Sequence, residues 1–108
     1  MRRESYTAIA ATALVVAIAA CSRPAPVAHA VKIQNFAFVP AEVTVAVGDT
    51  VVWSNADFVP HSATAGDSTW DSKAIAASDT WRFVARSPGR HEYVCVFHPN
   101  MKAAIVVR

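Results

Sequence analysis

Apolar residues recur at every second position through much of the chain after residue 30, which is the period of half-buried β-strands. Val43, Val45 and Val47 give the clearest case, and their run ends at the turn-forming pair Gly48-Asp49. A second turn is expected at 87–90 (SPGR), where Pro and Gly suit the backbone of a tight turn. The predicted strands are 31–33, 36–38, 43–47, 50–53, 80–85, 91–95 and 103–107.

A helical period of 3.6 residues is missing from every window of useful length, and residues 71–77 are expected to form one helical turn at most. Several short strands separated by regular turns are typical of sandwiches and barrels. The predicted fold class is therefore all-β, an antiparallel Greek-key β-sandwich or barrel.

The first residues predict an export signal. Arg2 and Arg3 form a positive start, and Thr7–Ala20 is a 14-residue apolar run, too short to span a bilayer as a helix. Two cleavage sites compete. The motif at 18–21 (IAAC) resembles a bacterial lipobox, in which Cys21 would be lipidated, whereas 28–30 (AHA) fits ordinary cleavage after Ala30.

The expected layout follows from these alternatives. Residues 1–20 form a lipoprotein-type signal peptide (alternatively 1–30), 21–30 a Pro/Ala-rich tether, and 31–108 one small domain. From Val31 onward seven Lys/Arg balance seven Asp/Glu, so the whole-chain charge of +2 belongs to the leader and tether. A neutral domain shows no basic bias towards nucleic acid.

Candidate chemistry is concentrated near the C-terminus, in the sequence VCVFHPNM (94–101). Cys95 has no intramolecular disulfide partner, because Cys21 is either lipidated or removed. The spacing Cys95-x-x-His98-x-x-Met101 in a predicted loop offers a thiolate, an imidazole and a thioether, a soft donor set that suits copper.

A blue-copper site needs a second imidazole, and the candidates are His61 and His91. His91 should share a strand face with Cys95, but it lies towards the far turn and is expected to be a surface or strand-end residue. His61 follows the strand 50–53 in a loop that can approach the Cys95 loop. We therefore select His61.

These features together resemble the small blue-copper (type 1) cupredoxins of the plastocyanin/azurin family, and amicyanin most closely. The resemblance covers residues 31–108 and includes FAFVPAEVTVAVGDTVVWSN (36–55), Pro60-His61, DTWRF (79–83), SPGRHEYVC (87–95) and the compact C-x-x-H-x-x-M spacing. It implies one copper ion, with His61, Cys95 and His98 as equatorial ligands and Met101 as the axial one.

The resemblance also assigns supporting residues. Asn55 matches an Asn that ties the two ligand-bearing loops together, although Val96 stands where relatives often carry a hydroxyl partner. Ser62 would offer its N–H to the sulfur, and Pro99 removes one donor near the site. The aromatic residues Trp53, Trp70, Trp81, Phe36, Phe38 and Phe83 are expected in the core.

The implied function is single-electron transfer between transient redox partners in the periplasm or cell envelope, by a monomer that touches membrane only through a lipid at Cys21. Because four protein ligands leave no open position for a substrate, we expect no enzymatic activity. The alternative is a copper-delivery module with the same ligands.

Overall fold

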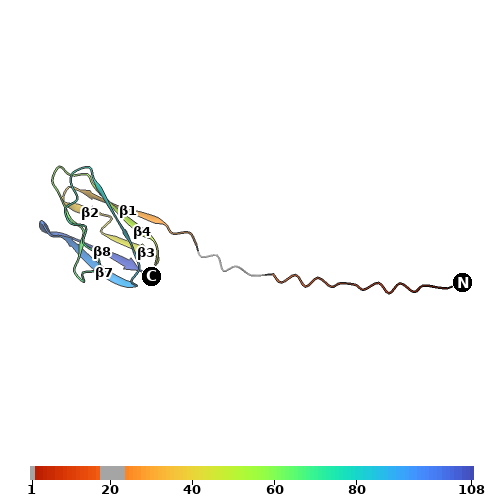
Figure 1. Ribbon diagram of the computed structural model, residues 1–108. Coiled ribbons are helices and arrows are strands. Elements are labelled where there is room, and N and C mark those ends of the chain that lie inside the picture. The colour runs from red at the N-terminus through yellow and green to blue at the C-terminus, as the bar shows by residue number, and fades with distance from the viewer. Residues whose placement is uncertain (1, 18–23) are drawn as a thin grey trace.

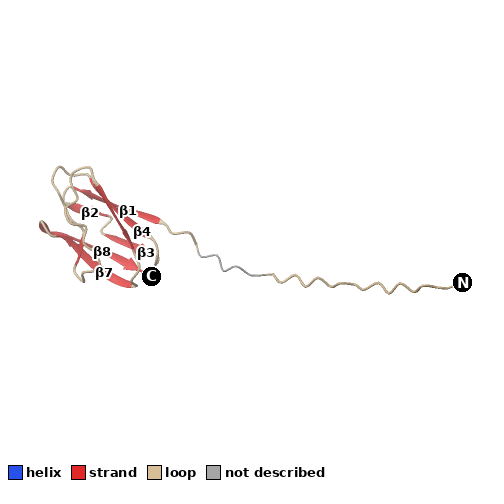
Figure 2. Cartoon of the chain, viewed as in Figure 1, coloured by secondary structure: helices blue, strands red, loops and turns tan. Residues whose placement is uncertain are grey.

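The computed structural model describes residues 2–17 and 24–108 (Figure 1). Within these residues eight strands form two four-stranded sheets that face each other, as Figure 2 shows. The strands are β1 (Ala28–Gln34), β2 (Ala37–Val39), β3 (Glu42–Val45), β4 (Thr50–Asn55), β5 (Thr64–Ala65), β6 (Thr80–Val84), β7 (Gly89–Cys95) and β8 (His98–Val107). The all-β fold class is confirmed. No helix in the described part of the chain is long and apolar enough to cross a membrane.

The order of strands is β2-β1-β4-β6 in one sheet and β3-β8-β7-β5 in the other. Both sheets are mixed, because β1 pairs with β4 and β3 pairs with β8 in parallel. The expectation of a purely antiparallel arrangement is corrected here. Parallel pairs need a crossover between strands that are not adjacent in sequence. The alternation of side chains shows which face of a strand is buried, but it does not show which strand lies beside it.

Strand β1 begins at Ala28, three residues before the expected domain boundary at Val31. Residues 28–30 pair with β4, in the register Ala28↔Thr50 to Ala30↔Val52. The alternation was hard to recognise there because Ala28 and Ala30 are small and exposed. The tether predicted over 21–30 is therefore already part of the sheet from Ala28 onward, and Cys21 lies outside the described residues.

The core lies between the two sheets, around aromatic side chains. Trp53 is fully buried at its centre, and its indole Nε1–H donates a hydrogen bond of 3.2 Å to the hydroxyl of Tyr93. Trp53, Trp70 and Phe38 are buried, and Trp81 and Phe83 pack against them as partly buried residues. Burial raises the pKa of Tyr93 to about 12, so its hydroxyl stays neutral.

Phe36 is the exception among the aromatic residues assigned to the core. It is 52% exposed, because Asn35 and Phe36 both have positive φ (51° and 56°) and form the turn of the β1–β2 hairpin. Two residues with positive φ are what a tight two-residue hairpin requires. The turn therefore directs Phe36 away from the sandwich interior.

His91 is buried at the end of the sandwich where β7 begins, rather than lying on the surface. Its Nδ1 bonds the carboxylate of Asp67 and its Nε2 lies 2.8 Å from the carbonyl of Ser87. These contacts raise the pKa of His91 above 6.5, the Asp67 bond most of all. Hydrogen bonds from Thr69, followed by that from His91, lower the pKa of Asp67 from 3.8 to about 2.

We predict that this pair stabilises the protein most strongly between roughly pH 4 and pH 6.5. The contribution of His91, whose folded pKa is raised, is complete below pH 6.5 and is lost as pH rises through that folded pKa. The contribution of Asp67, whose folded pKa is lowered, is present above pH 3.8 and is lost as pH falls towards 2. The difference in melting temperature between wild type and Asp67→Asn should therefore peak in this window. A difference that stayed constant from pH 4 to pH 9 would contradict the assignment.

Candidate metal centre

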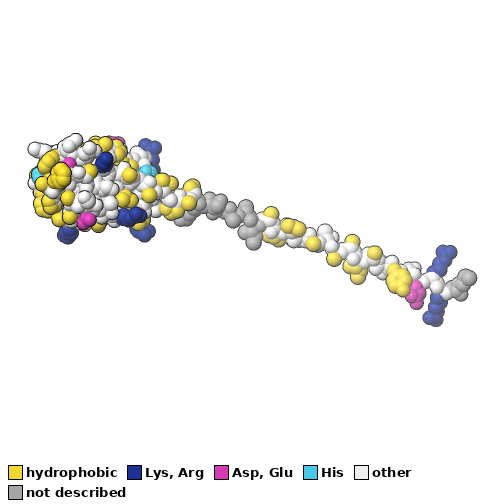
Figure 3. Space-filling model, turned by 90° about the horizontal axis from the view of Figure 1, so that it is seen from above, with side chains coloured by type: hydrophobic (Ala, Val, Ile, Leu, Met, Phe, Trp, Pro, Cys, Tyr) yellow, Lys and Arg dark blue, Asp and Glu magenta, His cyan; other side chains and the backbone are white. Residues whose placement is uncertain are grey.

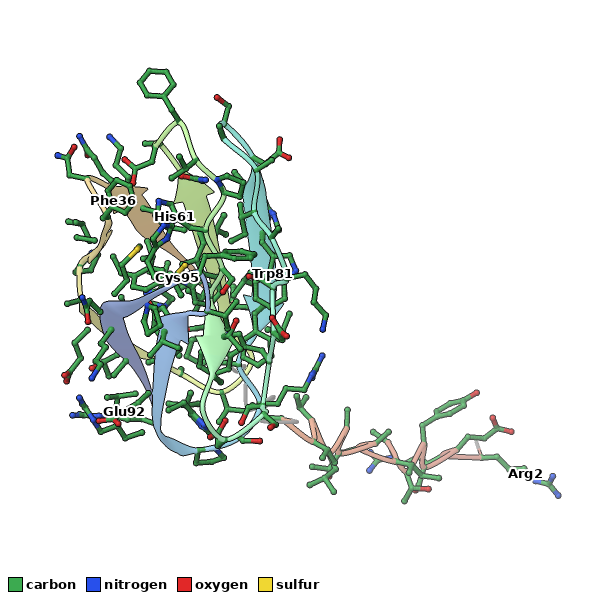
Figure 4. The ribbon with its side chains drawn as sticks, turned by 90° about the vertical axis from the view of Figure 1, so that its left-hand side faces the viewer. Arg2, Phe36, His61, Trp81, Glu92 and Cys95 are labelled. Carbon is green, nitrogen blue, oxygen red and sulfur yellow. The ribbon has the colours of Figure 1, made fainter. Side chains whose placement is uncertain are left out.

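Three donor side chains converge near one end of the sandwich. The sulfur of Cys95 lies 3.7 Å from Nδ1 of His61 and 3.6 Å from Nδ1 of His98. The ligand atoms of all three residues lie within 4.8 Å of one another. Figure 4 labels His61, in the loop between β4 and β5, and Cys95, at the end of β7, and shows them near the end of the sandwich that carries Phe36.

Cys95 and His98 are brought together by the β7–β8 hairpin. Cys95 is the last residue of β7 and His98 the first of β8, and the two are paired across the hairpin. Only Val96 and Phe97 connect the strands, so the ligand segment is a tight hairpin end rather than the longer loop expected from the sequence. A register irregularity between Val94 and Cys95 accompanies the turn, and such irregularities re-aim side chains at the ends of sheets.

His61 is fixed from both sides of its ring and along its backbone. Its N–H and C=O pair with the C=O and N–H of Ile75 at 3.2 Å and 2.7 Å. Its Nε2 lies 2.8 Å from a carboxylate oxygen of Asp57, which leaves Nδ1 to face the sulfur. A carboxylate that bonds the outer nitrogen of a ligand His fixes its tautomer and orientation. His61 is fully buried, so this orientation is protected from water.

Asp57 connects His61 to the neighbouring hairpin turn. Its two carboxylate oxygens accept the N–H groups of Asn35 at 2.7 Å and Phe36 at 2.9 Å, in addition to the bond with His61. The Phe36 N–H is the largest cause that lowers the pKa of Asp57 below 3.8, so the carboxylate is charged at neutral pH. Asp57 was not identified from the sequence, because a carboxylate four residues before a histidine is common in loops.

Phe36 lies against both imidazole rings. Its ring centroid is 5.2 Å from that of His61 and 5.0 Å from that of His98, and both contacts are edge-to-face. Such geometry is favourable for aromatic pairs. Phe36 therefore covers the outer side of the donor cluster. The hydrophobic pattern of the sequence could not reveal this role, because it predicted a core position for Phe36.

Asn55 braces the His61 side of the site only. Its side-chain nitrogen donates to the carbonyls of Val59 at 2.8 Å and Ile75 at 2.9 Å, and its oxygen accepts the N–H of Asp57 at 3.0 Å. The expected bond from Asn55 to the Cys95 segment is replaced by another contact, because Val96 has no hydroxyl with which Asn55 could pair.

Ser62 makes that connection instead. Its N–H donates to the sulfur of Cys95 at 3.3 Å, as expected from the sequence, and its hydroxyl oxygen accepts the N–H of Val96 at 2.9 Å. The hydroxyl also bonds Thr64, whose own hydroxyl donates to Asp71. Two hydrogen bonds in opposite directions thus join the His61 segment to the ligand hairpin.

The two remaining candidate residues lie on β8. Met101 is buried at 4% exposure, three residues after His98, and Pro99 is exposed beside His98. The Met101 thioether therefore lies on the inner side of β8. Pro99, which has no N–H, lies on the outer side.

The donor geometry fits a bound metal ion. Nitrogen and sulfur donors held about 2.0–2.3 Å from one ion, in a trigonal or tetrahedral arrangement, lie about 3.5–3.8 Å apart. The observed separations of 3.6 Å and 3.7 Å fall in that range. Two imidazoles, a thiolate and an adjacent thioether form the donor set that copper occupies in electron-transfer sites.

Comparisons with known proteins agree with this reading. The model of the cupredoxin-like domain family matches residues 6–107. The chain is 29% identical over 82 residues to amicyanin-alpha of Methylorubrum extorquens, covering 71% of this chain and 69% of that protein. It is 26% identical over 95 residues to amicyanin of Paracoccus versutus, covering 83% and 71%.

Solved structures give the same picture. A Cu(I) structure of an amicyanin variant superposes with a TM-score of 0.70 at 27% identity, over 75% of this chain and 82% of that one. A purple cupredoxin from Nitrosopumilus maritimus superposes with a TM-score of 0.69 at 24% identity, over 74% and 99%, which is a likeness of fold.

We predict that Asp57→Ala lowers the free energy of unfolding by about 1–3 kcal/mol, because two backbone N–H groups and His61 lose their acceptor. Urea unfolding of the metal-free protein measures this change. The matched control is Asp79→Ala, which makes the same Asp-to-Ala change at an exposed position. Equal stability of the two variants would show that Asp57 does not hold the site together.

Proposed function

Because the chain belongs to the cupredoxin-like domain family, we propose that it is a type 1 blue-copper protein that carries single electrons between redox partners in the bacterial cell envelope. The observation that carries the proposal is the convergence of His61, Cys95 and His98 on one point, with Met101 buried on the adjoining strand. The residues that would hold the copper ion are His61, Cys95, His98 and Met101.

Bound copper would supply the one-electron Cu(II)/Cu(I) couple. The chain's own contribution is to hold the donors still and to exclude water. His61 and Cys95 are fully buried, and each is anchored by hydrogen bonds from a second segment, His61 by the backbone of Ile75 and Cys95 by the N–H of Ser62. Because the donors are held in place, their positions would change little between the Cu(II) and Cu(I) states. The N–H of Ser62 directed at the sulfur stabilises negative charge there.

Four protein donors also argue against catalysis, because they leave no open position for a substrate. His98 differs from the other two donors in being partly exposed. It is therefore the ligand through which an electron can leave or enter with the shortest path to a partner.

Apolar side chains surround this exposed ligand. Phe36 contacts His98 directly, Val96 and Phe97 precede it in the hairpin turn, and Phe58 in the His61 loop is fully exposed. Figure 3 shows hydrophobic side chains at the end of the domain opposite the N-terminal segment. A small apolar surface suits the brief, weak docking of redox proteins. Docking of redox partners at this surface, which we call the His98 patch (Phe36, Phe58, Val96, Phe97), is part of the proposal.

The envelope location rests on the sequence of the leader. Its charged start and short apolar run support export to the periplasm, with lipidation at Cys21 as one mode of membrane attachment. The domain itself acts as a monomer. The alternative of a copper-delivery module gains no support from the relatives, which are amicyanins.

We predict that adding Cu(II) to the purified domain produces an intense visible absorption that Cys95→Ser abolishes, because that colour requires the thiolate. The contrasting variant is Met101→Gln, which keeps copper and colour but has a lower reduction potential, since an amide oxygen favours Cu(II). Visible spectra and voltammetry measure both effects. A Cys95→Ser protein that remained intensely coloured would overturn the ligand assignment.

We predict that Phe97→Lys slows electron self-exchange between reduced and oxidised protein by at least about tenfold, because two like charges then meet in the encounter complex. The matched control is Val47→Lys. Val47 is 52% exposed against 53% for Phe97, but it lies beside the C-terminal residue Arg108, far from the patch. NMR line broadening of mixed oxidation states measures the rate. If both variants slowed exchange equally, the His98 patch would not be the docking surface.

A further inference from the structure

The side chain of Asp49 binds the first residues of the folded domain. One of its oxygens accepts the N–H of Val27 at 2.9 Å, and the other bonds Nε2 of His29 at 2.9 Å. The same carboxylate accepts the N–H of Ala46 at 2.9 Å, within its own turn. Asp49 is only 7% exposed, so these donors replace water around a buried charge. The Val27 N–H is the largest cause that lowers the pKa of Asp49 to about 2.

The backbone of the same segment is part of the sheet. The N–H of Thr50 donates to the carbonyl of Val27 at 3.0 Å, and residues 28–30 continue the parallel ladder with β4. This portion is three of the seven residues of β1. It is therefore a structural element rather than a remnant of the leader.

A chain cut after Ala30 would begin at Val31, which is fully buried. The cut would place a charged α-amino group on that buried residue and remove two of the donors of Asp49. Burying an unpaired charge costs far more than losing a single hydrogen bond. Two separate penalties would thus fall on a domain of about 78 residues, a size at which stability is already marginal.

We infer that the segment Val27–Ala30 is retained in the mature protein, so that the leader is removed before Val27 and the sequence AHA at 28–30 is a strand rather than a processing site. Of the two cleavage sites that the sequence offers, the one before Cys21 leaves this segment intact.

The retained segment also fixes where the N-terminal chain leaves the domain. Ala28 pairs with Thr50 at one end of β4, whereas Asn55, which braces the His61 loop, is at the other end. In Figure 4 the N-terminal segment leaves the sandwich at the end away from Phe36 and His61. An anchor attached upstream of Val27 therefore leaves the His98 patch facing away from the membrane.

The decisive experiment is intact-mass analysis of the mature protein after expression of the full chain with its own leader in a Gram-negative bacterium. A first residue from 21 to 27, with or without a lipid on Cys21, supports the inference, whereas a chain that keeps residues 1–20 contradicts removal of the leader. A first residue after Val27, such as Val31, overturns it. The variant Ala30→Gln removes the small residue that cleavage after Ala30 would need. Its mature N-terminus should be unchanged, and accumulation of unprocessed chain would contradict the inference.

A stability measurement tests the structural role of the segment separately. We predict that His29→Ala lowers the melting temperature of the mature protein by about 4–8 °C, because Asp49 loses a partner. The matched control is Lys32→Ala, at an exposed position of the same strand, which should leave the melting temperature unchanged. Equal melting temperatures for wild type and His29→Ala would overturn the role of the segment. Neither readout depends on copper or on electron transfer.

Discussion

The candidate metal centre depends on the two hydrogen bonds of Ser62. The His61 loop and the Cys95–His98 hairpin come from distant parts of the sequence, and the short β5–β7 pairing joins them only beyond the donors, at Thr64 and Ala65. Ser62 donates its N–H to the sulfur and accepts the N–H of Val96 through its hydroxyl, so a shift of either segment would break both bonds. The donor atoms are therefore positioned before any metal binds, which is the condition for a centre that changes oxidation state with little rearrangement.

The fold class and the donor residues were accessible from the sequence because both are local patterns. Alternating apolar residues report the buried face of a strand, and the spacing C-x-x-H-x-x-M reports three soft donors within one short segment. The parallel pairings of β1 with β4 and of β3 with β8 were not accessible, because register between distant strands leaves no local trace. Phe36 was misassigned for a related reason, since its exposure depends on the backbone of a two-residue turn rather than on its hydrophobicity.

Among the hydrogen bonds that orient the donor residues, only those made by the backbone were predicted from the sequence. The N–H of Ser62 is present whatever its side chain, and it points at the sulfur as expected. The partners of Asn55 changed because they depend on the side chain at position 96, and Asp57 was missed because a carboxylate four residues before a histidine is common in loops. Sequence spacing thus identifies donors better than it identifies what orients them.

Three of the four histidines share one arrangement, in which an aspartate that also accepts backbone N–H groups holds the ring. The pairs are His29 with Asp49, His61 with Asp57 and His91 with Asp67. Each pair fastens a loop or a strand end that the short sheets alone would leave loose. Within the described residues His98 forms no ion pair with a carboxylate, and its ring contacts are with the sulfur, His61 and Phe36. A carboxylate there would add charge and bound water at the surface where we propose that a redox partner docks. The absence of an acidic partner at His98 is therefore consistent with its proposed use as the ligand through which electrons pass, just as the three aspartates are consistent with rigidity elsewhere.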